Sequence, residues 1–326
     1  MTYDPGDGGR AALAEALAPH AGVRFLPDAS GDERSQWLAV VEVLITWSLD
    51  RDLEPGDLER AERLRLVQLM SAGADTVDFA ALPRSVTVAA NVGAFADPMA
   101  EHALGMTLAL AKRLPAYHAQ LAEGEYPPDP ETIELRGGVA AIVGFSGIGR
   151  ACAALFRALG MRIHAINTSG RTGEELDFVG GPADLERVLG GADVVVLAVP
   201  LTRHTRGLIG ARELSWMKRT AVLINVARAA IVDETALCDH LVATPEFSAG
   251  LDVWWEEPER GEPFRPRLPF LQLPNVLGSP HNSGIVPGMA ERAAASAARN
   301  VARFIAGEPP RGVQRPEDYS SSARIE

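Results

Sequence analysis

Three residues of types that carry proton and anion chemistry each follow an apolar, strand-like run: Arg228, Glu257 and His281. Arg228 and Glu257 are 29 positions apart, and Glu257 and His281 are 24 positions apart. An imidazole can donate a proton near neutral pH, and a planar guanidinium forms paired hydrogen bonds with a carboxylate. Taken singly, each residue is more often ordinary: a helix-capping charge, a solvated turn carboxylate and a loop histidine.

The runs before these residues belong to a series of apolar, β-branched segments that alternate with helix-like stretches. The strand candidates are 23–27, 42–46, 64–69, 86–89, 139–144, 162–166, 193–199, 221–226, 248–253 and 275–278. Apolar strands that alternate with helices are typical of parallel sheets covered on both faces. The sequence therefore predicts an α/β fold with two doubly wound parallel sheets.

The chain has 326 residues, which suits two domains. We predict one domain from residues 1–95 plus 286–326 and a second from 96–285. Helix-like residues 98–113, with Asp97 as a candidate N-cap, begin the second domain. An apolar strand is expected before Tyr3 and is missing. Either the true start of the chain lies upstream or this sheet has lost an edge strand, and we expect the former.

Bulk composition narrows the class of protein. Hydrophobic residues make up 47% of the chain, charged residues 23%, and the net charge is −12. An acidic surface repels phosphate backbones, which argues against a nucleic-acid partner. The sequence has no apolar run long enough for a membrane span, no signal-peptide pattern and only two cysteines. These features favour a cytoplasmic protein without membrane contact.

The strand at 139–144 leads into a glycine-rich loop and a helix that begins near Arg150. The loop consists of Gly144, Phe145, Ser146, Gly147, Ile148 and Gly149. It is similar to the dinucleotide fingerprint, in which backbone N–H groups and a helix N-terminus bind a pyrophosphate. Ser146 stands where the second glycine is usual, and its hydroxyl could donate to a phosphate. An ordinary strand-to-helix turn is the alternative interpretation.

Cofactor choice depends on the loop after the next strand, about twenty residues further on. An acidic side chain there would bind the ribose hydroxyl of NAD, but no acid occurs before Glu174. The loop instead contains Asn167, Thr168, Ser169 and Arg171. Because a guanidinium pairs well with a phosphate, we predict NADP in preference to NAD; a plain polar loop is the alternative.

Several segments together resemble the D-isomer-specific 2-hydroxyacid dehydrogenases. They read MSAGAD (70–75), NVGAFADPMAEHAL (91–104), PLTRHTRGLIG (200–210), TAVLINVARAAIVDETAL (220–237), AGLDVWWEEP (249–258) and PNVLGSPHNSG (274–284). The resemblance covers about residues 40–306. It implies a Rossmann-type cofactor domain plus a flavodoxin-like substrate domain, and hydride transfer between NAD(P)H and a small 2-keto acid.

The resemblance also assigns roles to single residues. His281 would protonate the carbonyl oxygen, Glu257 would hydrogen-bond the other ring nitrogen, and Arg228 would hold the substrate carboxylate. Backbone N–H groups near Ala72 and Gly73 would bind that carboxylate from the other domain. Asp252 would bind the nicotinamide amide. The remaining cofactor contacts would come from Pro200, Thr205, Val226 and Ala227, and no metal is expected.

The resemblance leaves some interpretations open. The rivals to a dehydrogenase are a dinucleotide-sensing scaffold of the corepressor type and a decayed enzyme. Glu257 argues against formate oxidation, which needs no acid. Either Trp254 or Trp255 could line the pocket, or the tryptophans could pack against the following loop. Family members dimerise through the cofactor domain, which predicts a homodimer in which Tyr126 reaches the neighbouring site. His102, His118 and His164 are interpreted as structural, and His204 as solvent-exposed.

Overall fold

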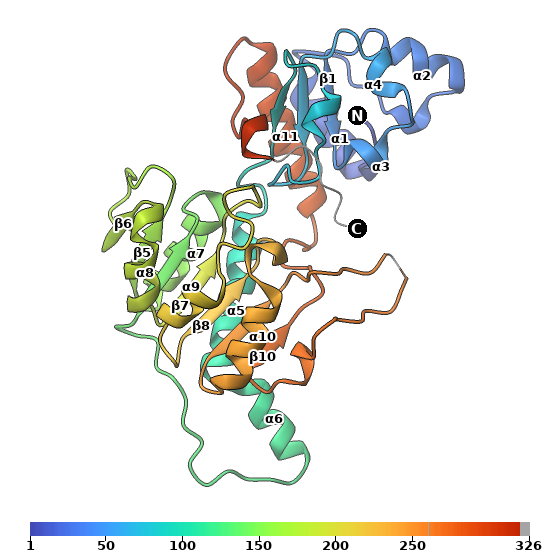
Figure 1. The fold of residues 1–326 in the computed structure, drawn as a ribbon. Helices are drawn as coiled ribbons and strands as arrows, with labels where there is room; N and C mark the ends of the chain where they lie inside the picture. The colour runs from blue at the N-terminus through green and yellow to red at the C-terminus, as the bar shows by residue number, and fades with distance from the viewer. Residues whose placement is uncertain (260, 320–326) are drawn as a thin grey trace. The chain divides into compact units, whose positions relative to one another are not determined.

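The computed structural model describes residues 1–259 and 261–319, which divide into two compact units. The first unit contains Met1–Phe95 and the segment that returns at Val286, and the second is Ala96–Ile285. Each unit is built on a parallel sheet with helices, so the predicted α/β class is confirmed (Figure 1). The assignment of substrate to one unit and dinucleotide to the other stays a prediction. The end of the predicted segment 286–326 lies outside the described residues.

The second unit contains a seven-stranded sheet in the order β10-β9-β8-β7-β4-β5-β6, with every pair parallel. The strands are β4 (Val139–Val143), β5 (Arg162–Ile166), β6 (Phe178–Gly180), β7 (Val194–Leu197), β8 (Val222–Asn225), β9 (Ser248–Leu251) and β10 (Val276–Gly278). The chain moves outward from β4 through β5 and β6, then returns to the other side of β4 at β7. A reversal of this kind marks the ligand-binding edge of a doubly wound sheet.

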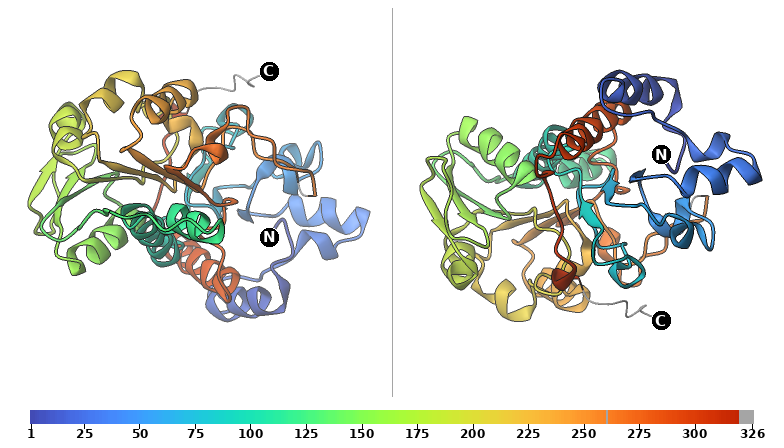
Figure 2. Two further views of the ribbon diagram at one scale, coloured as in Figure 1. Left: turned by 90° about the horizontal axis from the view of Figure 1, so that it is seen from below. Right: turned by 90° about the horizontal axis from the view of Figure 1, so that it is seen from above.

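Helices cover both faces of this sheet (Figure 2). They are α5 (Ala96–Ala111), α7 (Gly147–Ala158), α8 (Leu185–Gly191), α9 (Ala211–Trp216) and α10 (Glu234–Ala243). Ala140 and Ile142 of β4 pack with α5 and α7, whereas Ala141 and Val143 pack with the other three helices. Both sides of each strand are thus buried, as the unbroken apolar runs predict.

Two details at the start of the second unit bear on the sequence predictions. α5 begins at Ala96, so Asp97 lies in its first turn and the prediction of Asp97 as the N-cap is wrong. The next helix, α6 (Leu114–Ala122), buries none of its residues. After it, residues 124–137 form no helix or strand, as the proline-rich composition indicates.

The first unit has a three-stranded parallel sheet of β1 (Val43–Thr46), β2 (Leu66–Leu69) and β3 (Thr87–Ala89). Its helices are α1 (Gly6–Leu17), α2 (Gly31–Leu38), α3 (Leu49–Asp52), α4 (Asp57–Arg60) and α11 (Met289–Ile305). α1 and α11 lie side by side on one face of the sheet, as both views of Figure 2 show. None of the helices in the described part of the chain has the length and apolar character that crossing a membrane requires.

Residues Met1 and Thr2 lie beside β1, at the edge of the three-stranded sheet, without forming a strand. The Thr2 N–H donates to the Ile45 carbonyl at 3.0 Å, and the Leu26 N–H donates to the Met1 carbonyl at 2.8 Å. The prediction of a strand at 23–27 is wrong, because a short 3-10 helix begins at Leu26 and Pro27 lacks the N–H that a strand needs.

A groove of about 490 Å³ lies beside Met1 and β1. Apolar side chains, among them Leu17, Val23, Val43 and Phe304, form much of its lining. The Met1 amine donates to the Arg24 carbonyl at 2.7 Å, and burial lowers the pKa of this amine to about 5. An apolar groove therefore borders β1 at the edge of the three-stranded sheet.

Candidate active site

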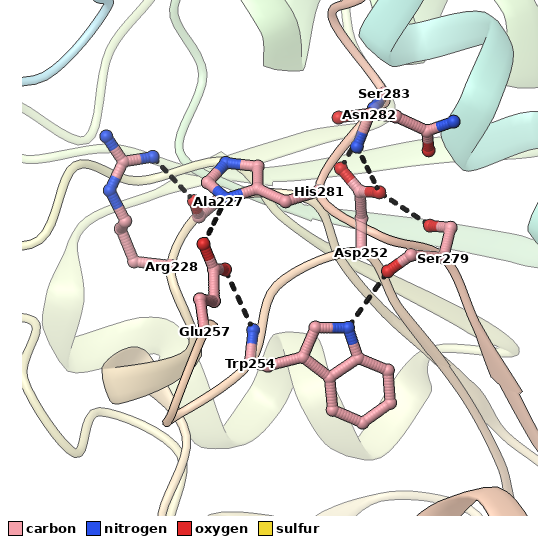
Figure 3. Close-up of polar contacts among 9 residues, drawn as sticks. All are labelled: Ala227, Arg228, Asp252, Trp254, Glu257, Ser279, His281, Asn282 and Ser283. Carbon is pink, nitrogen blue, oxygen red and sulfur yellow. Dashed lines mark hydrogen bonds and ion pairs between the residues drawn. The ribbon is translucent and has the colours of Figure 1, made fainter. Parts of the chain in front are cut away.

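Arg228, Glu257 and His281 all lie at the carboxyl edge of the seven-stranded sheet. Arg228 follows β8, Glu257 follows β9 and His281 follows β10, and these three strands are neighbours. Figure 3 shows their side chains gathered on one side of the site, with the guanidinium of Arg228 beside the imidazole of His281. The structure thus brings the three predicted residues together, while their roles in a reaction stay predictions.

His281 and Glu257 form a hydrogen-bonded pair. Nδ1 of His281 lies 2.8 Å from Oε2 of Glu257, and the two side chains are 42% and 39% exposed. The Trp254 N–H donates to Oε1 of the same carboxylate at 3.2 Å. Partial burial opposes ionisation of Glu257, but the hydrogen bond from His281 and the charges of His281 and Arg228 outweigh it and lower the pKa of the Glu257 carboxyl. An ionised carboxylate accepts a hydrogen bond from the N–H at Nδ1, which leaves Nε2 as the nitrogen for a substrate.

The backbone at His281 has a left-handed conformation that L-residues adopt rarely. Its φ is 52°, and among the described residues other than glycine only Arg113 shares a positive φ. Asp252, which is completely buried, accepts hydrogen bonds from the next two backbone N–H groups, those of Asn282 at 3.0 Å and Ser283 at 3.1 Å. These bonds hold the turn that carries the imidazole, and a strained residue held in this way is a common feature of active sites.

Arg228 is held by its own loop after β8. Asn225, which is fully buried, donates from Nδ2 to the Arg228 carbonyl at 3.0 Å and accepts from the Ala227 N–H at 3.1 Å. The guanidinium donates from Nη1 to the Ala227 carbonyl at 2.9 Å. Asn225 thus holds this loop in place, and the sequence analysis did not identify Asn225 in that role.

The glycine-rich loop connects β4 to α7 and has the shape that a pyrophosphate site requires. Gly144 has a φ of 103°, and a Cβ at Gly149 would lie 2.0 Å from the Gly144 carbonyl oxygen, so both positions exclude any side chain. Ser146 is the exposed N-cap residue of α7, and its side chain forms no capping hydrogen bond. Gly147 and Ile148 are partly exposed in the first turn. The loop therefore offers N–H groups and one hydroxyl at a helix N-terminus, which suits the dinucleotide.

The loop after β5 contains the four residues predicted to select the cofactor. Asn167 accepts from the Ser169 N–H at 3.0 Å and donates to the Arg171 carbonyl at 2.8 Å. Thr168, Ser169 and Arg171 are exposed. Asn167 thus orders the loop and leaves the Arg171 side chain at the surface, where a phosphate could reach it.

The remaining predicted cofactor residues also follow strands of this sheet. Pro200 and Thr205 lie after β7, where the Thr205 hydroxyl donates to the Pro200 carbonyl at 2.6 Å. Val226 and Ala227 are buried directly after β8. These positions share the carboxyl edge with the glycine-rich loop, which is where a doubly wound sheet binds its ligand.

The predicted substrate loop belongs to the other unit. Ala72 and Gly73 follow β2 in the first unit, where the Ser71 hydroxyl donates to the Gly73 carbonyl at 2.7 Å. Their contact with a substrate carboxylate stays a prediction.

The two tryptophans of the WW pair are held by neighbouring side chains and carbonyls. Trp254 is 9% exposed, donates from Nε1 to the Ser279 carbonyl at 2.9 Å and contacts the ring of Phe264 edge-on. Trp255 donates to the Val232 carbonyl at 2.9 Å and stacks on Phe270. These contacts favour packing, the alternative that the sequence left open, for both residues.

Sequence reasoning missed a set of polar residues behind the site. The Ser279 hydroxyl donates to Oδ1 of Asp252 at 2.5 Å, and Nε2 of His102 lies 2.8 Å from the same hydroxyl oxygen. His102 was interpreted as structural, yet it belongs to the network that holds the turn of His281. The only signal for Ser279 in the sequence is its place two residues before the histidine.

Comparison with known proteins gives consistent results. Residues 104–283 match the family model described as D-isomer specific 2-hydroxyacid dehydrogenase, NAD binding domain. The chain is 30% identical to the glyoxylate reductase of Thermococcus litoralis over 89% of this chain and 87% of the relative. It is 31% identical to the glycerate dehydrogenase of Methylorubrum extorquens over 77% and 79%. A D-isomer specific 2-hydroxyacid dehydrogenase from Xanthobacter autotrophicus Py2, solved with NADPH and MES, has a TM-score of 0.77, 28% identity and coverage of 96% and 95%.

Proposed function

Since the chain belongs to the D-isomer-specific 2-hydroxyacid dehydrogenase family, we propose that it reduces the carbonyl of a small 2-keto acid to a D-2-hydroxy acid. It is an NAD(P)-dependent enzyme of this family. The single observation that carries the mechanism is the His281–Glu257 pair, with 2.8 Å between Nδ1 and the carboxylate, beside Arg228. A scaffold without turnover is not favoured by relatives that are named as reductases and dehydrogenases.

The proposed reaction divides between the three side chains. When bound, the nicotinamide supplies the hydride for the carbonyl carbon. The guanidinium of Arg228 holds the substrate carboxylate through paired hydrogen bonds and polarises the adjacent carbonyl. His281 gives the proton on Nε2 to the carbonyl oxygen, while Glu257 keeps Nδ1 protonated and stabilises the imidazolium before the transfer. In the reverse direction the same nitrogen would accept the hydroxyl proton.

The substrate class follows from the relatives together with Glu257. Glyoxylate and hydroxypyruvate are the keto acids suggested by relatives named glyoxylate reductase and glycerate dehydrogenase. A carboxylate partner hydrogen-bonded to the histidine suits reduction of a carbonyl, which consumes a proton, whereas formate oxidation consumes none. We therefore expect no turnover of formate.

NADP is the proposed preference between the two dinucleotides. Arg171 is exposed after β5, and the nearest acid along the loop, Glu174, is engaged by Arg150 at 2.6 Å. A free acidic side chain would repel the extra phosphate of NADP, and this contact screens that charge. The Xanthobacter autotrophicus relative was solved with NADPH, which supports the preference.

A homodimer is proposed for the assembled enzyme. Leu114, Leu121 and Tyr126 of the α6 region are 58%, 53% and 87% exposed. Exposed apolar side chains on, and just after, a helix without a fully buried residue are typical of an interface. Light scattering is expected to give twice the mass of the chain, and the Tyr126→Ala variant is expected to raise Michaelis constants if this residue reaches the neighbouring site. A cytoplasmic location stays a prediction.

The test of the proposed function is a turnover screen. Loss of the nicotinamide absorbance is followed with NADPH and with NADH against glyoxylate, hydroxypyruvate and larger 2-keto acids, with formate and NAD(P)⁺ as a negative control. We expect reduction of at least one keto acid and no oxidation of formate. Tight binding of NADPH without turnover of any keto acid would instead identify a scaffold, and absence of binding would identify a decayed enzyme.

A further inference from the structure

A polar network lies behind the turn that carries His281, and His102 of α5 forms its outer end. Nε2 of His102 is 2.8 Å from Oγ of Ser279 and 3.6 Å from Oδ1 of Asp252. The same Ser279 oxygen is 2.5 Å from Oδ1 of Asp252. The three residues come from a helix and from the ends of two neighbouring strands, so the contacts depend on the folded sheet.

The direction of each hydrogen bond in this network is determined by the number of protons available. The backbone N–H groups of Asn282 and Ser283 can only donate, so the carboxyl of Asp252 is an acceptor toward both (Figure 3). The Ser279 hydroxyl has one proton, and it uses this proton in its hydrogen bond to the carboxylate. Its oxygen must therefore accept from His102, and this requires a proton on Nε2 of His102.

The network has a consequence for the backbone of His281. The carboxylate of Asp252 is completely buried, and a buried carboxylate needs donors around it. Ser279 and the two N–H groups that follow His281 supply these donors, and His102 orients and polarises the serine hydroxyl. These bonds hold the turn in which His281 has its left-handed φ of 52°.

We propose that His102 and Ser279 are positioning residues for His281, acting through Asp252. This inference rests on the proposed function, because it requires His281 to be the proton donor. His102 orients the hydroxyl of Ser279, Ser279 fixes Oδ1 of Asp252, and Asp252 holds the backbone that aims the imidazole at the substrate. The Trp254 indole assists by donating to the Ser279 carbonyl at 2.9 Å.

The first test compares variants that remove or keep each hydrogen bond. Ser279→Ala and His102→Leu are expected to lower kcat for keto-acid reduction by about tenfold to a hundredfold, as small displacements of a reacting group do. Michaelis constants are expected to change less than about threefold, since the bound ligands keep their own contacts. Ser279→Thr keeps the hydroxyl and His102→Gln keeps a donor near Nε2, so both are expected to recover most of the rate.

The matched control is Thr107→Val on the same helix. The Thr107 hydroxyl is buried and donates to the Ala103 carbonyl at 2.7 Å, outside the network. The Thr107→Val variant is expected to lower the melting temperature without a selective loss of kcat. Equal losses of stability and kcat in the control and in Ser279→Ala would show that Ser279 is merely structural.

A double-mutant cycle connects the network to His281. If His102 and Ser279 act through the proton donor, Ser279→Ala in the His281→Asn background is expected to cause no further loss of rate. Full additivity would overturn the inference while leaving the proposed function intact. Near-normal turnover of His281→Asn itself would instead remove the proposed function.

A measurement without cofactor or turnover completes the test. Nitrogen NMR of the histidine-labelled protein is expected to find His102 protonated at Nε2, and Ser279→Ala is expected to shift the ring signals of His281. A His102 ring protonated only at Nδ1, or a His281 signal that ignores Ser279→Ala in a folded protein, would contradict the inference. The wild-type spectrum decides the first point even where a variant fails to fold.

Discussion

At the carboxyl edge of the seven-stranded sheet, the loops after β8, β9 and β10 hold side chains in a hydrogen-bond network, whereas the loop after β4 offers mainly backbone groups. Glu257, His281 and Asp252 each have at least one partner at 3.2 Å or less. In the glycine-rich loop Ser146 has an exposed side chain that forms no capping hydrogen bond. Gly144 and Gly149 have no side chain. The part of the edge formed by the loops after β8, β9 and β10, which we call the catalytic end, suits the proposed proton transfer. The part formed by the loops after β4 and β5, which we call the dinucleotide end, suits the proposed binding of an anion.

A site made of side chains and a site made of backbone groups place different requirements on the sequence. A proton donor needs a particular residue type, so its replacement removes a chemical step. A backbone cradle needs the absence of side chains, because a Cβ at Gly144 would lie 2.5 Å from the Ala198 carbonyl oxygen. We therefore expect variants at the catalytic end to lower kcat and variants at the dinucleotide end to change cofactor affinity.

The largest expected effect is that of His281→Asn. Removal of a general acid costs about 10² to 10⁴ in rate, so kcat for keto-acid reduction is expected to fall by about 10³. Affinity for NADPH, measured by protein fluorescence, is expected to stay within about threefold because the dinucleotide loop is untouched. Parallel losses of rate and cofactor affinity would break the separation between the two ends.

Glu257→Gln sharpens the catalytic end further through its pH dependence. The pKa of the Glu257 carboxyl is lowered, so this group stays ionised down to acidic pH and supports a protonated His281. Because reduction needs that proton, the wild-type rate is expected to fall as pH rises. Loss of the negative charge destabilises the imidazolium, so the fall in rate is expected to begin at lower pH in the variant. An unchanged pH profile between pH 5 and 10 would contradict this role.

The same carboxyl contributes to folding with a definite sign. Since its pKa in the folded protein lies below the unfolded value, its contribution is present above the unfolded pKa and is lost as pH falls through the folded pKa. Denaturant unfolding of the wild type is therefore expected to show a drop in stability at acidic pH that is smaller in Glu257→Gln. The opposite order would indicate that the carboxyl is strained rather than stabilised by His281.

Arg171→Ala tests the dinucleotide end. Loss of one guanidinium–phosphate contact, worth about 1.4 kcal/mol or more, is expected to raise the Michaelis constant for NADPH by about tenfold. The constant for NADH and kcat with either cofactor are expected to change little. Arg219→Ala is the matched control, because its guanidinium pairs with Glu246 at 3.0 Å before β8 begins, away from the dinucleotide loops. Equal effects on NADPH and NADH would show that Arg171 does not select the cofactor.

The sequence predicted most elements of the second unit because its strands are apolar on both faces, as in Val194–Leu197. β6, Phe178–Gly180, was missed because three residues in a polar stretch leave no periodic signal. The candidate catalytic residues were named through family motifs, since separations of 24 and 29 positions carry no geometry by themselves.

The supporting residues could not be found in this way. His102 and Ser279 are 177 positions apart, and nothing local in either segment indicates that they meet. Asn225 ends an apolar strand, and a single amide in such a segment gives no indication that it will bind the next loop. Partners of buried polar groups are decided by the tertiary fold, which explains why the sequence named the candidate catalytic residues and missed those that hold them.

The smallest expected effect is that of Ser146→Gly, which restores the usual glycine at the second loop position. The substitution removes one hydroxyl and gives the backbone more freedom at the N-cap of α7. Because a neutral hydrogen bond contributes about 0.5–1.5 kcal/mol and the closer backbone approach offsets its loss, cofactor affinity is expected to change less than about fivefold. A loss beyond about tenfold with unchanged stability would mean that the Ser146 hydroxyl binds the phosphate directly. The dinucleotide end would then depend on side-chain chemistry, as the catalytic end does.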